Sequence, residues 1–581
     1  MHAARSGAAV GLALEVAACG GGGGGGGTGT GTGGGGGAPT VAAVRRPETD
    51  AEAARFLLQA SLSASTAAIA EVRSEGYEPW LDRQMRTPND QSAREFFAAR
   101  GYDQVDANRF YNSAVIGDYM IWSQLLSGGN SVRKRVAFAL SEFFVVSLSA
   151  INLTWRGPAI GEYWDVLNRQ AFGNFRDLLQ DITLNPAMGV FLNTRGNRRA
   201  DGTGRVPDEN YAREVMQLFT IGLFELNPDG TLRLNAGNPI ETYTSEDVTG
   251  LARVFTGYDF DSVGLARTPE PGSTRQIIDP EYARRPMTAD PARWQPARTT
   301  GFHATEAKTF LGLTIPAGTG AAESLRLALD QLFNHPNVGP FFARQMIQRL
   351  VTSNPSPAYV KRVADVFANN GQGRRGDLAA VFKAILTDAE ALDPANIANP
   401  NFGKLREPVL RLAQIARTFG GRSTSGNWQI GDLSDPASSL GQSPLRAPSV
   451  FNFFRPGYFP ANTEIANRGL LAPEFQLVNE TSVAGYVNFL ERAVQGARAP
   501  VGDLALDYSA EIAIAQDSTQ LLDRLDLLLT GRQLTASVRD TIRAAMEDVP
   551  VTASSTNDAR LQRVRIGVVL ILASTDYLIQ K

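Results

Sequence analysis

Two side chains of this chain are suited to acid–base chemistry and lie in or beside flexible loops. Glu214 belongs to segment 208–222, which has helical spacing and follows the Gly-rich loop 195–207. His303 lies in a second loop, a few residues before Lys308. A carboxyl group and an imidazole ring can donate or accept a proton when their surroundings tune the pKa. Glu214 and His303 are therefore our candidate catalytic residues.

Further polar residues in the same segments are candidates for binding a substrate or a partner. Asn210 and Glu214 are four residues apart, so they share one face of the predicted helix. The binding candidates are Asn210, Arg213, Arg253 and Lys308. An alternative explanation needs no function, because Glu209 and Arg213 are also four residues apart and would form a surface ion pair. In that case the polar face ties neighbouring helices together.

The composition narrows the classes of function. The chain has 581 residues, with 56 basic and 59 acidic side chains. Charge that is so evenly balanced provides no basic surface, so we expect no nucleic-acid partner. One cysteine and three histidines are too few for a classical zinc site, and we predict no metal site. No nucleotide-binding loop or serine-hydrolase motif is visible, and the sequence identifies no cofactor.

Cys19, the single cysteine of the chain, predicts the cellular location of the protein. It follows Val16–Ala18 and an apolar stretch with a basic start, a pattern typical of a bacterial lipoprotein signal peptide. The sulfur of such a cysteine carries a diacylglycerol, which holds an exported protein on a membrane of the cell envelope. We expect residues 1–18 to be the signal peptide, and 19–46 to be the lipidated cysteine with a disordered Gly- and Thr-rich tether. The alternative is a cytosolic chain with a chance cysteine.

The remaining chain is predicted to be mainly α-helical: a large multi-helix body with long irregular loops and a few short β-hairpins. Apolar residues recur at helical spacing in most segments. Two segments rich in turn-forming residues interrupt this pattern. The predicted order is an N-terminal helical region, an irregular insert, a central helical region, a loop-rich segment with many Pro and aromatic residues, and a C-terminal helical region: 47–258, 259–320, 321–420, 421–475 and 476–581.

The loop-rich segment contains a cluster of aromatic side chains: Phe451, Phe453, Phe454, Tyr458 and Phe459. A loop rarely buries so much apolar surface unless a second surface covers it. Two hypotheses follow. Either the cluster plugs into the helical core, or it forms a docking surface for another protein or a glycan.

Several segments resemble blocks of one large bacterial family. The most specific block is 208–222, which reads DENYAREVMQLFTIG. The other blocks are 133–142, 243–257, 303–312, 403–408 and 444–457. On these blocks the chain is identified as a lipoprotein member of the domain of unknown function 1800 (DUF1800) family, with a match that runs from about residue 53 to the C-terminus.

The resemblance implies an exported, mostly helical bacterial protein without an established activity. Members of the family are often encoded beside a sulfatase-like family, which implies a secreted sulfatase-like partner. The block around His303 departs from the family pattern, because Ala304-Thr305-Glu306 stands where Asp, Pro or Gly is commoner. This departure weakens any proposed site that would need an Asp at that place.

Two hypotheses for the function remain open. In the first, a lipid-anchored helical protein binds or supports a secreted partner at the cell envelope. In the second, a hydrolase acts on an envelope or extracellular polymer through acid–base chemistry of Glu214 and His303. The second hypothesis requires the candidate residues to share one cleft.

Cys19→Ser is expected to release the protein from the membrane, because serine has no thiol to accept the diacylglycerol. The variant should appear in the periplasm or the medium, and its circular dichroism spectrum should equal that of the wild type. Cell fractionation with immunoblotting measures the distribution. Retention of the variant in the membrane fraction would contradict the lipid anchor.

Overall fold

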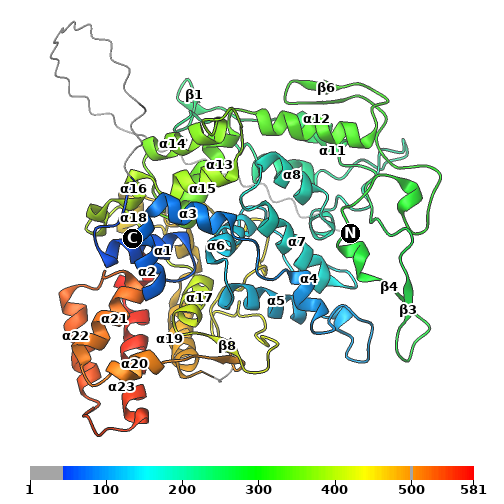
Figure 1. Cartoon of the computed structure of the whole chain (residues 1–581). Coiled ribbons are helices and arrows are strands. Elements are labelled where there is room, and N and C mark those ends of the chain that lie inside the picture. The colour runs from blue at the N-terminus through cyan, green and yellow to red at the C-terminus, as the bar shows by residue number, and fades with distance from the viewer. Residues whose placement is uncertain (1–43, 497–500) are drawn as a thin grey trace, which may run out of the picture. The chain divides into compact units, whose positions relative to one another are not determined.

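Helices dominate the part of the chain that the structure, a computed structural model, describes: residues 44–496 and 501–581 (Figure 1). The predicted mainly α fold is therefore confirmed. The predicted signal peptide, Cys19 and most of the predicted tether lie outside the described residues. Residues 44–581 group into one compact unit, and the boundaries predicted inside it stay predictions. No helix within the described ranges is long and apolar enough to cross a membrane.

Most of the helices that precede the Gly-rich loop pack around α7, which contacts α4, α5, α6, α8 and α9. In chain order, the helices of this part of the chain are α1 (Asp50–Ala60), α2 (Thr66–Glu75), α3 (Tyr77–Arg86), α4 (Ala93–Ala98), α5 (Val115–Leu126), α6 (Ser131–Ser141), α7 (Arg156–Gln170), α8 (Phe175–Thr183) and α9 (Pro186–Phe191). Tyr163 and Trp164 of α7 are fully buried at the centre of this group. The Tyr163 hydroxyl group donates to the backbone oxygen of Phe144 at 2.7 Å, which satisfies its one polar atom inside the core.

The middle of the chain continues with helices that pack in sequence, α13 on α14 and α14 on α15. These helices are α10 (Asn210–Gln217), α11 (Ser245–Ala252), α12 (Ala321–Asn334), α13 (Val338–Leu350), α14 (Pro357–Ala368), α15 (Leu378–Leu386), α16 (Ala389–Leu392) and α17 (Pro408–Thr418). Short 3₁₀ turns lie between or beside the helices: η1 (Phe110–Asn112), η2 (Pro280–Ala283), η3 (Pro291–Arg293), η4 (Pro394–Ile397) and η5 (Pro473–Leu477).

Most of the C-terminal helices pack against α23, and one of them, α21, also contacts α1 (Figure 1). In chain order, the C-terminal helices are α18 (Glu464–Asn467), α19 (Glu480–Gln495), α20 (Ser509–Ile514), α21 (Ser518–Thr530), α22 (Ala536–Glu547), α23 (Asn557–Ala573) and α24 (Thr575–Leu578). The apolar pattern of residues 510–529 predicts one continuous helix, and that prediction is wrong. The segment divides into α20 and α21 because Asp517 caps a new helix, accepting hydrogen bonds from the N–H groups of Thr519 and Gln520.

The strands form only short antiparallel pairs in the described residues. They are β1 (Leu234–Asn235) with β2 (Asn238–Pro239), β3 (Arg267–Pro269) with β4 (Gln276–Ile278), β5 (Lys308–Phe310) with β6 (Leu313–Ile315), β7 (Lys404–Leu405) with β10 (Ile579–Gln580), and β8 (Arg422–Ser423) with β9 (Leu504–Ala505). Three pairs join neighbouring segments, as the predicted hairpins do. The β7–β10 and β8–β9 pairs join segments that are far apart in the sequence.

Two helix boundaries differ from the prediction in ways that matter for the site. The apolar pattern of residues 131–147 predicts a helix of that length, but α6 ends at Ser141, and Glu142 is its C-cap residue. The predicted helix 208–222 is shorter, because α10 ends at Gln217. The residues after both helices therefore leave the helical path and line a cavity. The sequence pattern also misses α5, which is buried on nearly every side and so lacks the apolar period of a half-exposed helix.

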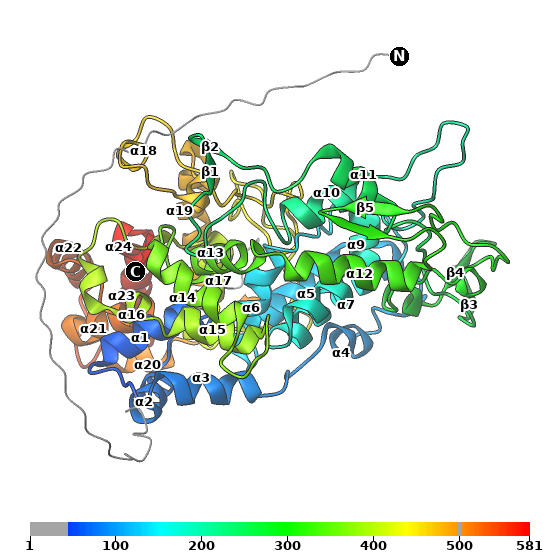
Figure 2. The ribbon, with the colours of Figure 1, turned by 90° about the horizontal axis from the view of Figure 1, so that it is seen from above.

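The strand β5 packs against α11 (Figure 2). At Gly250 of α11, an added methyl group would overlap the carbonyl oxygen of Thr309. Gly250→Ala is expected to lower the free energy of unfolding by about 1–3 kcal/mol, although alanine is the better helix former. Urea unfolding followed by circular dichroism measures the change. Gly431→Ala is the control, since no described atom lies within 4 Å of its new methyl group. Equal stability of the two variants would argue against the crowding.

Candidate functional site

A pocket of about 470 Å³ opens where distant parts of the chain meet. Its walls come from the residues after α6, the end of α10 with the residues that follow, one face of α13, and the loop 442–457. Its apolar lining includes Phe143, Leu218, Leu223, Phe341 and Phe451. Its polar lining includes Glu142, Gln217, Gln345, Arg349 and Arg455. This size, and apolar walls with a few polar groups, are typical of a ligand-binding site.

Helical spacing aligns the α13 side chains that line the pocket. Phe341, Gln345 and Arg349 are each four residues apart, so they form one face of the helix. Phe341 fits against Gly222, where a Cβ atom would lie 2.7 Å from the ring. The φ angle of 73° at Gly222 also favours glycine. Glycine at this position therefore allows the segment after α10 to close against α13.

Hydrogen bonds fix the loop 442–457 beside the pocket. The N–H group of Leu148 donates to the backbone oxygen of Leu445 at 2.9 Å. The Arg446 guanidinium group binds both carboxylate oxygens of Asp118 on α5, at 2.6 and 2.8 Å. A bidentate pair of this kind fixes orientation as well as distance. The aromatic residues of the loop are thus held in place by contacts on two other segments.

The floor of the pocket carries a guanidinium group and a carboxyl group. Arg349 Nη2 donates to the backbone oxygen of Glu142 at 3.0 Å, and Nη1 donates to the backbone and side-chain oxygens of Gln345, each at 3.1 Å. Among the described residues, Arg349 Nε and Glu142 Oε2 are buried without a hydrogen-bond partner. Buried polar atoms normally have a partner. One donor and one carboxyl oxygen at the floor are therefore left without a protein partner among the described residues.

A set of buried charges lies behind this floor. The Lys404 ammonium group is 3.3 Å from the Glu407 carboxylate and 2.9 Å from that of Glu474, and it donates to the backbone oxygen of Arg349 at 2.8 Å. Arg135 Nη2 donates to the same oxygen at 2.5 Å. Charges in a protein interior persist only when they are paired. We call the following six residues together the buried charge network: Arg135, Glu142, Arg349, Lys404, Glu407 and Glu474.

The carboxyl groups of Glu142 and Glu407 have pKa values shifted in opposite directions. Burial, followed by the charge and proximity of Glu407, raises the pKa of Glu142 well above its usual range. Burial alone would raise the pKa of Glu407 too, but the charge of Lys404, the proximity of Glu142 and the charge of Arg135 lower it. These shifts favour the protonated form of Glu142 and the ionised form of Glu407.

Two more arginines add positive charge next to the network. Arg406 lies over the ring of Tyr577 at 4.9 Å, and Arg411 lies over the ring of Tyr486 at 4.5 Å. Both side chains are buried, and neither makes an ion pair within residues 44–496 and 501–581. With the three cations of the buried charge network, five described cationic side chains lie near three carboxyl groups, and the raised pKa of Glu142 favours the neutral form of one of them. The region behind the pocket thus has an excess of positive charge.

Four segments that carry the family resemblance meet at this place. They are 133–142, 208–222, 403–408 and 444–457. Each supplies either a wall of the pocket or members of the buried charge network. The segments are separated by many residues in the sequence, so only the tertiary structure brings them together.

Glu214, a predicted catalytic residue, lies on α10 one turn before the pocket wall. Its side chain is buried, and burial raises its pKa, while the charge of Arg213 acts in the opposite direction. Within the described part of the chain its Oε2 atom has no hydrogen-bond partner. Gln217, one turn further on, lines the pocket and accepts a hydrogen bond from the Tyr243 hydroxyl group at 3.0 Å. The catalytic role of Glu214 stays a prediction.

His303, the second predicted catalytic residue, contacts side chains other than Glu214. Its Nδ1 atom lies 2.9 Å from the backbone oxygen of Thr256, and its Nε2 atom lies 3.4 Å from the hydroxyl oxygen of Ser324. Burial lowers the pKa of His303, which favours the neutral ring. The ring thus bridges the end of α11 and the first turn of α12. Catalysis by His303 stays a prediction.

The binding candidates on α10 have local partners. Arg213 forms an exposed ion pair with Glu209 at 3.3 Å, as the alternative explanation of the spacing predicts. The backbone N–H group of Asn210 donates to the side chain of Asp208 at 2.8 Å, at the start of the helix. These contacts stabilise the helix start, and a binding role for Asn210 and Arg213 stays a prediction.

The binding candidates near β5 contact backbone oxygens. Arg253 Nη1 donates to Ala307 at 3.2 Å, and Lys308 Nζ donates to Glu306 at 3.4 Å. No hydrogen bond or ion pair in the described residues joins Arg253 or Lys308 to the side chain of Glu214. The candidates therefore divide between two places, α10 beside the pocket and the α11–β5 junction, and the binding roles stay predictions.

Sequence reasoning misses the residues that form the floor of the pocket. Arg135 and Glu142 lie within a strongly apolar helical segment, and Lys404 and Glu407 lie just before the Pro that starts α17. A charged residue on an apolar face is the signal that marks such sites, because burial of a charge requires a partner. The identity of that partner depends on tertiary contacts between segments as far apart as residues 135 and 349.

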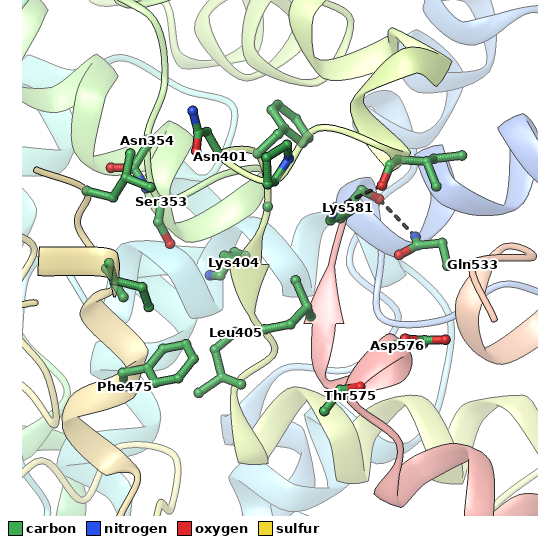
Figure 3. Close-up of a pocket in the computed structure, with 18 of the residues that line it drawn as sticks. Ser353, Asn354, Asn401, Lys404, Leu405, Phe475, Gln533, Thr575, Asp576 and Lys581 are labelled. Atoms are coloured by element: carbon green, nitrogen blue, oxygen red, sulfur yellow. Dashed lines mark hydrogen bonds between the residues drawn. The ribbon is translucent and has the colours of Figure 1, made fainter. Parts of the chain in front are cut away.

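A larger cavity of about 590 Å³ also borders Lys404 (Figure 3). Two of its polar side chains are already hydrogen-bonded to the protein: Gln533 Nε2 donates to the Lys581 backbone oxygen at 3.1 Å, and Lys581 Nζ donates to the Ile397 backbone oxygen at 2.8 Å. The Lys404 side chain is fully buried and directs its ammonium group into the buried charge network. This cavity therefore offers less chemistry to a ligand than the pocket over Glu142 and Arg349.

Comparison with known proteins identifies the family. Residues 55–579, nearly the whole chain, match the family described as Protein of unknown function (DUF1800). The family resemblance is thereby confirmed, while the match does not address the lipoprotein part. No curated protein and no solved structure matches the chain.

Glu142→Gln is expected to change the free energy of unfolding much less than Glu407→Gln. Glutamine resembles the protonated Glu142 side chain, whereas Glu407→Gln removes the charge that balances Lys404 and should cost about 3–5 kcal/mol. Chemical unfolding of both variants at neutral pH measures the difference. Equal losses would contradict the assignment of the proton to Glu142.

The pH dependence of the free energy of unfolding provides a second test of the protonation of Glu142. Because the pKa of Glu142 is raised above its unfolded value of 4.5, its stabilising contribution is complete below pH 4.5 and is lost as pH rises through the raised pKa. The wild type should therefore lose stability relative to Glu142→Gln as pH increases above 4.5. Unfolding of both proteins across this range checks the sign, and the opposite slope would contradict it.

Proposed function

We propose a binding role for this chain, which belongs to the DUF1800 family of proteins of unknown function. It is an exported protein, anchored to the cell envelope by a lipid on Cys19, and it binds an apolar group of a secreted partner in the pocket between α13 and the loop 442–457. The observation that carries this proposal is the set of exposed apolar side chains around the pocket mouth.

The exposed apolar side chains lie on two segments that line the pocket. Leu223 is 49% exposed and Phe451 is 37% exposed, and both belong to the pocket lining. The residues that follow Leu223 also expose Phe224, Leu232 and Leu234. Large apolar side chains that are exposed together mark interaction sites on protein surfaces. An apolar group that enters the pocket would cover Leu223 and Phe451 and remove their exposed surface from water.

The aromatic side chains of the segment 451–459 fit both hypotheses in part, because some of them are buried and others are exposed. This difference in exposure supports a binding role. Phe454 is buried, as the hypothesis of a core plug requires, while Phe451 and Phe459 remain exposed. The buried ring helps to anchor the loop, and the ion pair of Arg446 with Asp118 fixes it further. A rigid loop that presents an exposed aromatic ring loses little conformational entropy when a partner binds.

The choice of partner follows from the family resemblance and the predicted location. A sulfatase-like secreted protein is the expected partner, because members of the family are often encoded beside one. The lipid on Cys19 and the Gly- and Thr-rich tether would hold the helical unit near a membrane surface, where it meets exported proteins. This arrangement suits a protein that supports the maturation or retention of its partner.

A hydrolase remains the second hypothesis, with less support. It depends on joint chemistry of Glu214 and His303, and the described hydrogen bonds of the His303 ring go to Thr256 and Ser324. The group that holds a proton at the floor of the pocket is Glu142. Binding requires no second catalytic group beside it, and we therefore propose binding.

Leu223→Ser and Phe451→Ser should each weaken binding of the sulfatase-like protein from the same organism by tenfold or more, because each variant removes apolar area from the centre of the contact. Biolayer interferometry with the two purified full-length proteins measures the affinity. Val483→Ser is the matched control, since Val483 is 54% exposed on α19 and does not line the pocket. Equal affinity of all three variants would contradict this site for the partner.

A further inference from the structure

We infer that the group bound in this pocket ends in a carboxylate, so that the ligand is an apolar chain end whose negative charge lies against Arg349. This inference rests on the proposed binding role of the pocket and specifies the chemistry of the bound group. Two sources share that chemistry: the C-terminal residue of a protein with a large apolar side chain, and a free fatty acid.

The guanidinium group of Arg349 is the first support for this inference. The side chain lines the pocket, yet the residue is only 4% exposed. Both of its terminal nitrogens donate to Glu142 and Gln345, whereas Nε has no acceptor among the described residues. A buried N–H group without an acceptor costs free energy, and a charge-assisted bond to a carboxylate would recover it. Arg349 is therefore preorganised to receive an acceptor atom.

A second arginine lies at the mouth of the same pocket. Arg455 is exposed, and its guanidinium carbon is 4.8 Å from the centre of the Phe451 ring. Its side chain forms no ion pair with any described residue. A negatively charged ligand is thus attracted at the mouth and held at the floor, while the rings of Phe143, Phe341 and Phe451 enclose its apolar part.

The charge balance behind the floor favours an anionic ligand. Five described cationic side chains lie near three carboxyl groups, and burial raises the pKa of Glu142, which favours its neutral form. In a region of low dielectric, such an excess repels a cation and attracts an anion. A neutral ligand could place a carbonyl or hydroxyl oxygen against the free donor of Arg349, but it would leave the excess charge unbalanced. A carboxylate satisfies both.

The protonated side chain of Glu142 adapts the floor to a second carboxyl group. The charged and polar groups that surround Glu142 come from each neighbouring element: Arg135 of α6, Gln345 and Arg349 of α13, Lys404 of β7, Glu407 before α17, Asn452 of the loop and Glu474 of η5. A protonated Glu142 tolerates a bound carboxylate, whereas an ionised one repels it. Binding should therefore weaken as pH rises through the pKa of Glu142.

Isothermal titration with the full chain carrying Cys19→Ser tests the inference. The probes are a hexapeptide that ends in Leu-Phe with a free carboxylate, the same peptide with a C-terminal amide, decanoate and decanamide. We expect each acid to bind at least tenfold more tightly than its amide. A stronger response to the peptide acid identifies a protein C-terminus as the natural source, and a stronger response to decanoate identifies a fatty acid.

Variants of the two arginines assign the effect to this pocket. Arg349→Met should abolish the preference for the acid, and Arg349→Lys should retain part of it because the charge remains. Thermal unfolding shows whether Arg349→Met folds. Arg455→Ala, at an exposed position, tests the mouth independently and should weaken acid binding a fewfold and reduce its salt dependence. Arg326→Ala is the matched control, since Arg326 is an exposed arginine on α12.

Two variants of Glu142 and the partner assay complete the test. Glu142→Gln should keep the preference for acids and remove its dependence on pH, and Glu142→Asp should keep both. Equal binding of acids and amides to the wild type would overturn the carboxylate inference while leaving the proposed binding role intact. If none of the probes binds, the inference is also overturned, and the Leu223 and Phe451 variants then decide separately whether the pocket binds the partner.

Discussion

The ion pairs of Lys404 are the interaction on which the rest of the site depends. An ammonium group without exposed surface requires Glu407 and Glu474 within contact distance, and those residues come from different segments. Because a single buried charge costs several kcal/mol, the segments are stable only when all of them are assembled. The same constraint extends through Arg135 and Arg349 to the floor of the pocket. A change in this network would therefore alter the pocket without touching its walls.

The pocket combines an apolar enclosure with a charged floor, and each part strengthens the other. The aromatic rings of Phe143, Phe341 and Phe451 line the space above Arg349, and a ligand that fills this space would displace water from it. A lower local dielectric increases the strength of any charge-assisted hydrogen bond formed there. A lower dielectric also raises the free-energy cost of a buried donor without a partner, such as Arg349 Nε, so a ligand that supplies an acceptor there is favoured. Specificity thus arises from the environment of one guanidinium group rather than from a large number of contacts.

The helical architecture could be predicted from the sequence where helices have one buried face, because such helices show a clear apolar period. The period fails for α5, which is buried on most sides, and at the end of α6, where Phe143 and Phe144 continue the apolar pattern after the helix has ended. The segments around Glu214 and His303 could be found, but their relative positions depend on contacts between distant residues. Glu142 and Arg349 could not be predicted as site residues for the same reason. Each side chain indicates a site only when its contact with the other is known.

The β7–β10 pair has a consequence for the order in which the protein folds. Lys404 and Leu405 pair with Gln580 and Ile579, and the Arg406 N–H group donates to Leu578 at 2.7 Å. The strand that contains Lys404 therefore lacks its partner until residue 580 has left the ribosome. Contacts between segments so far apart also form slowly, because loop closure costs entropy before any contact is gained. The central helices are therefore synthesised long before β7 can pair with β10. This part of the tertiary structure cannot be completed until residues 579 and 580 have been synthesised.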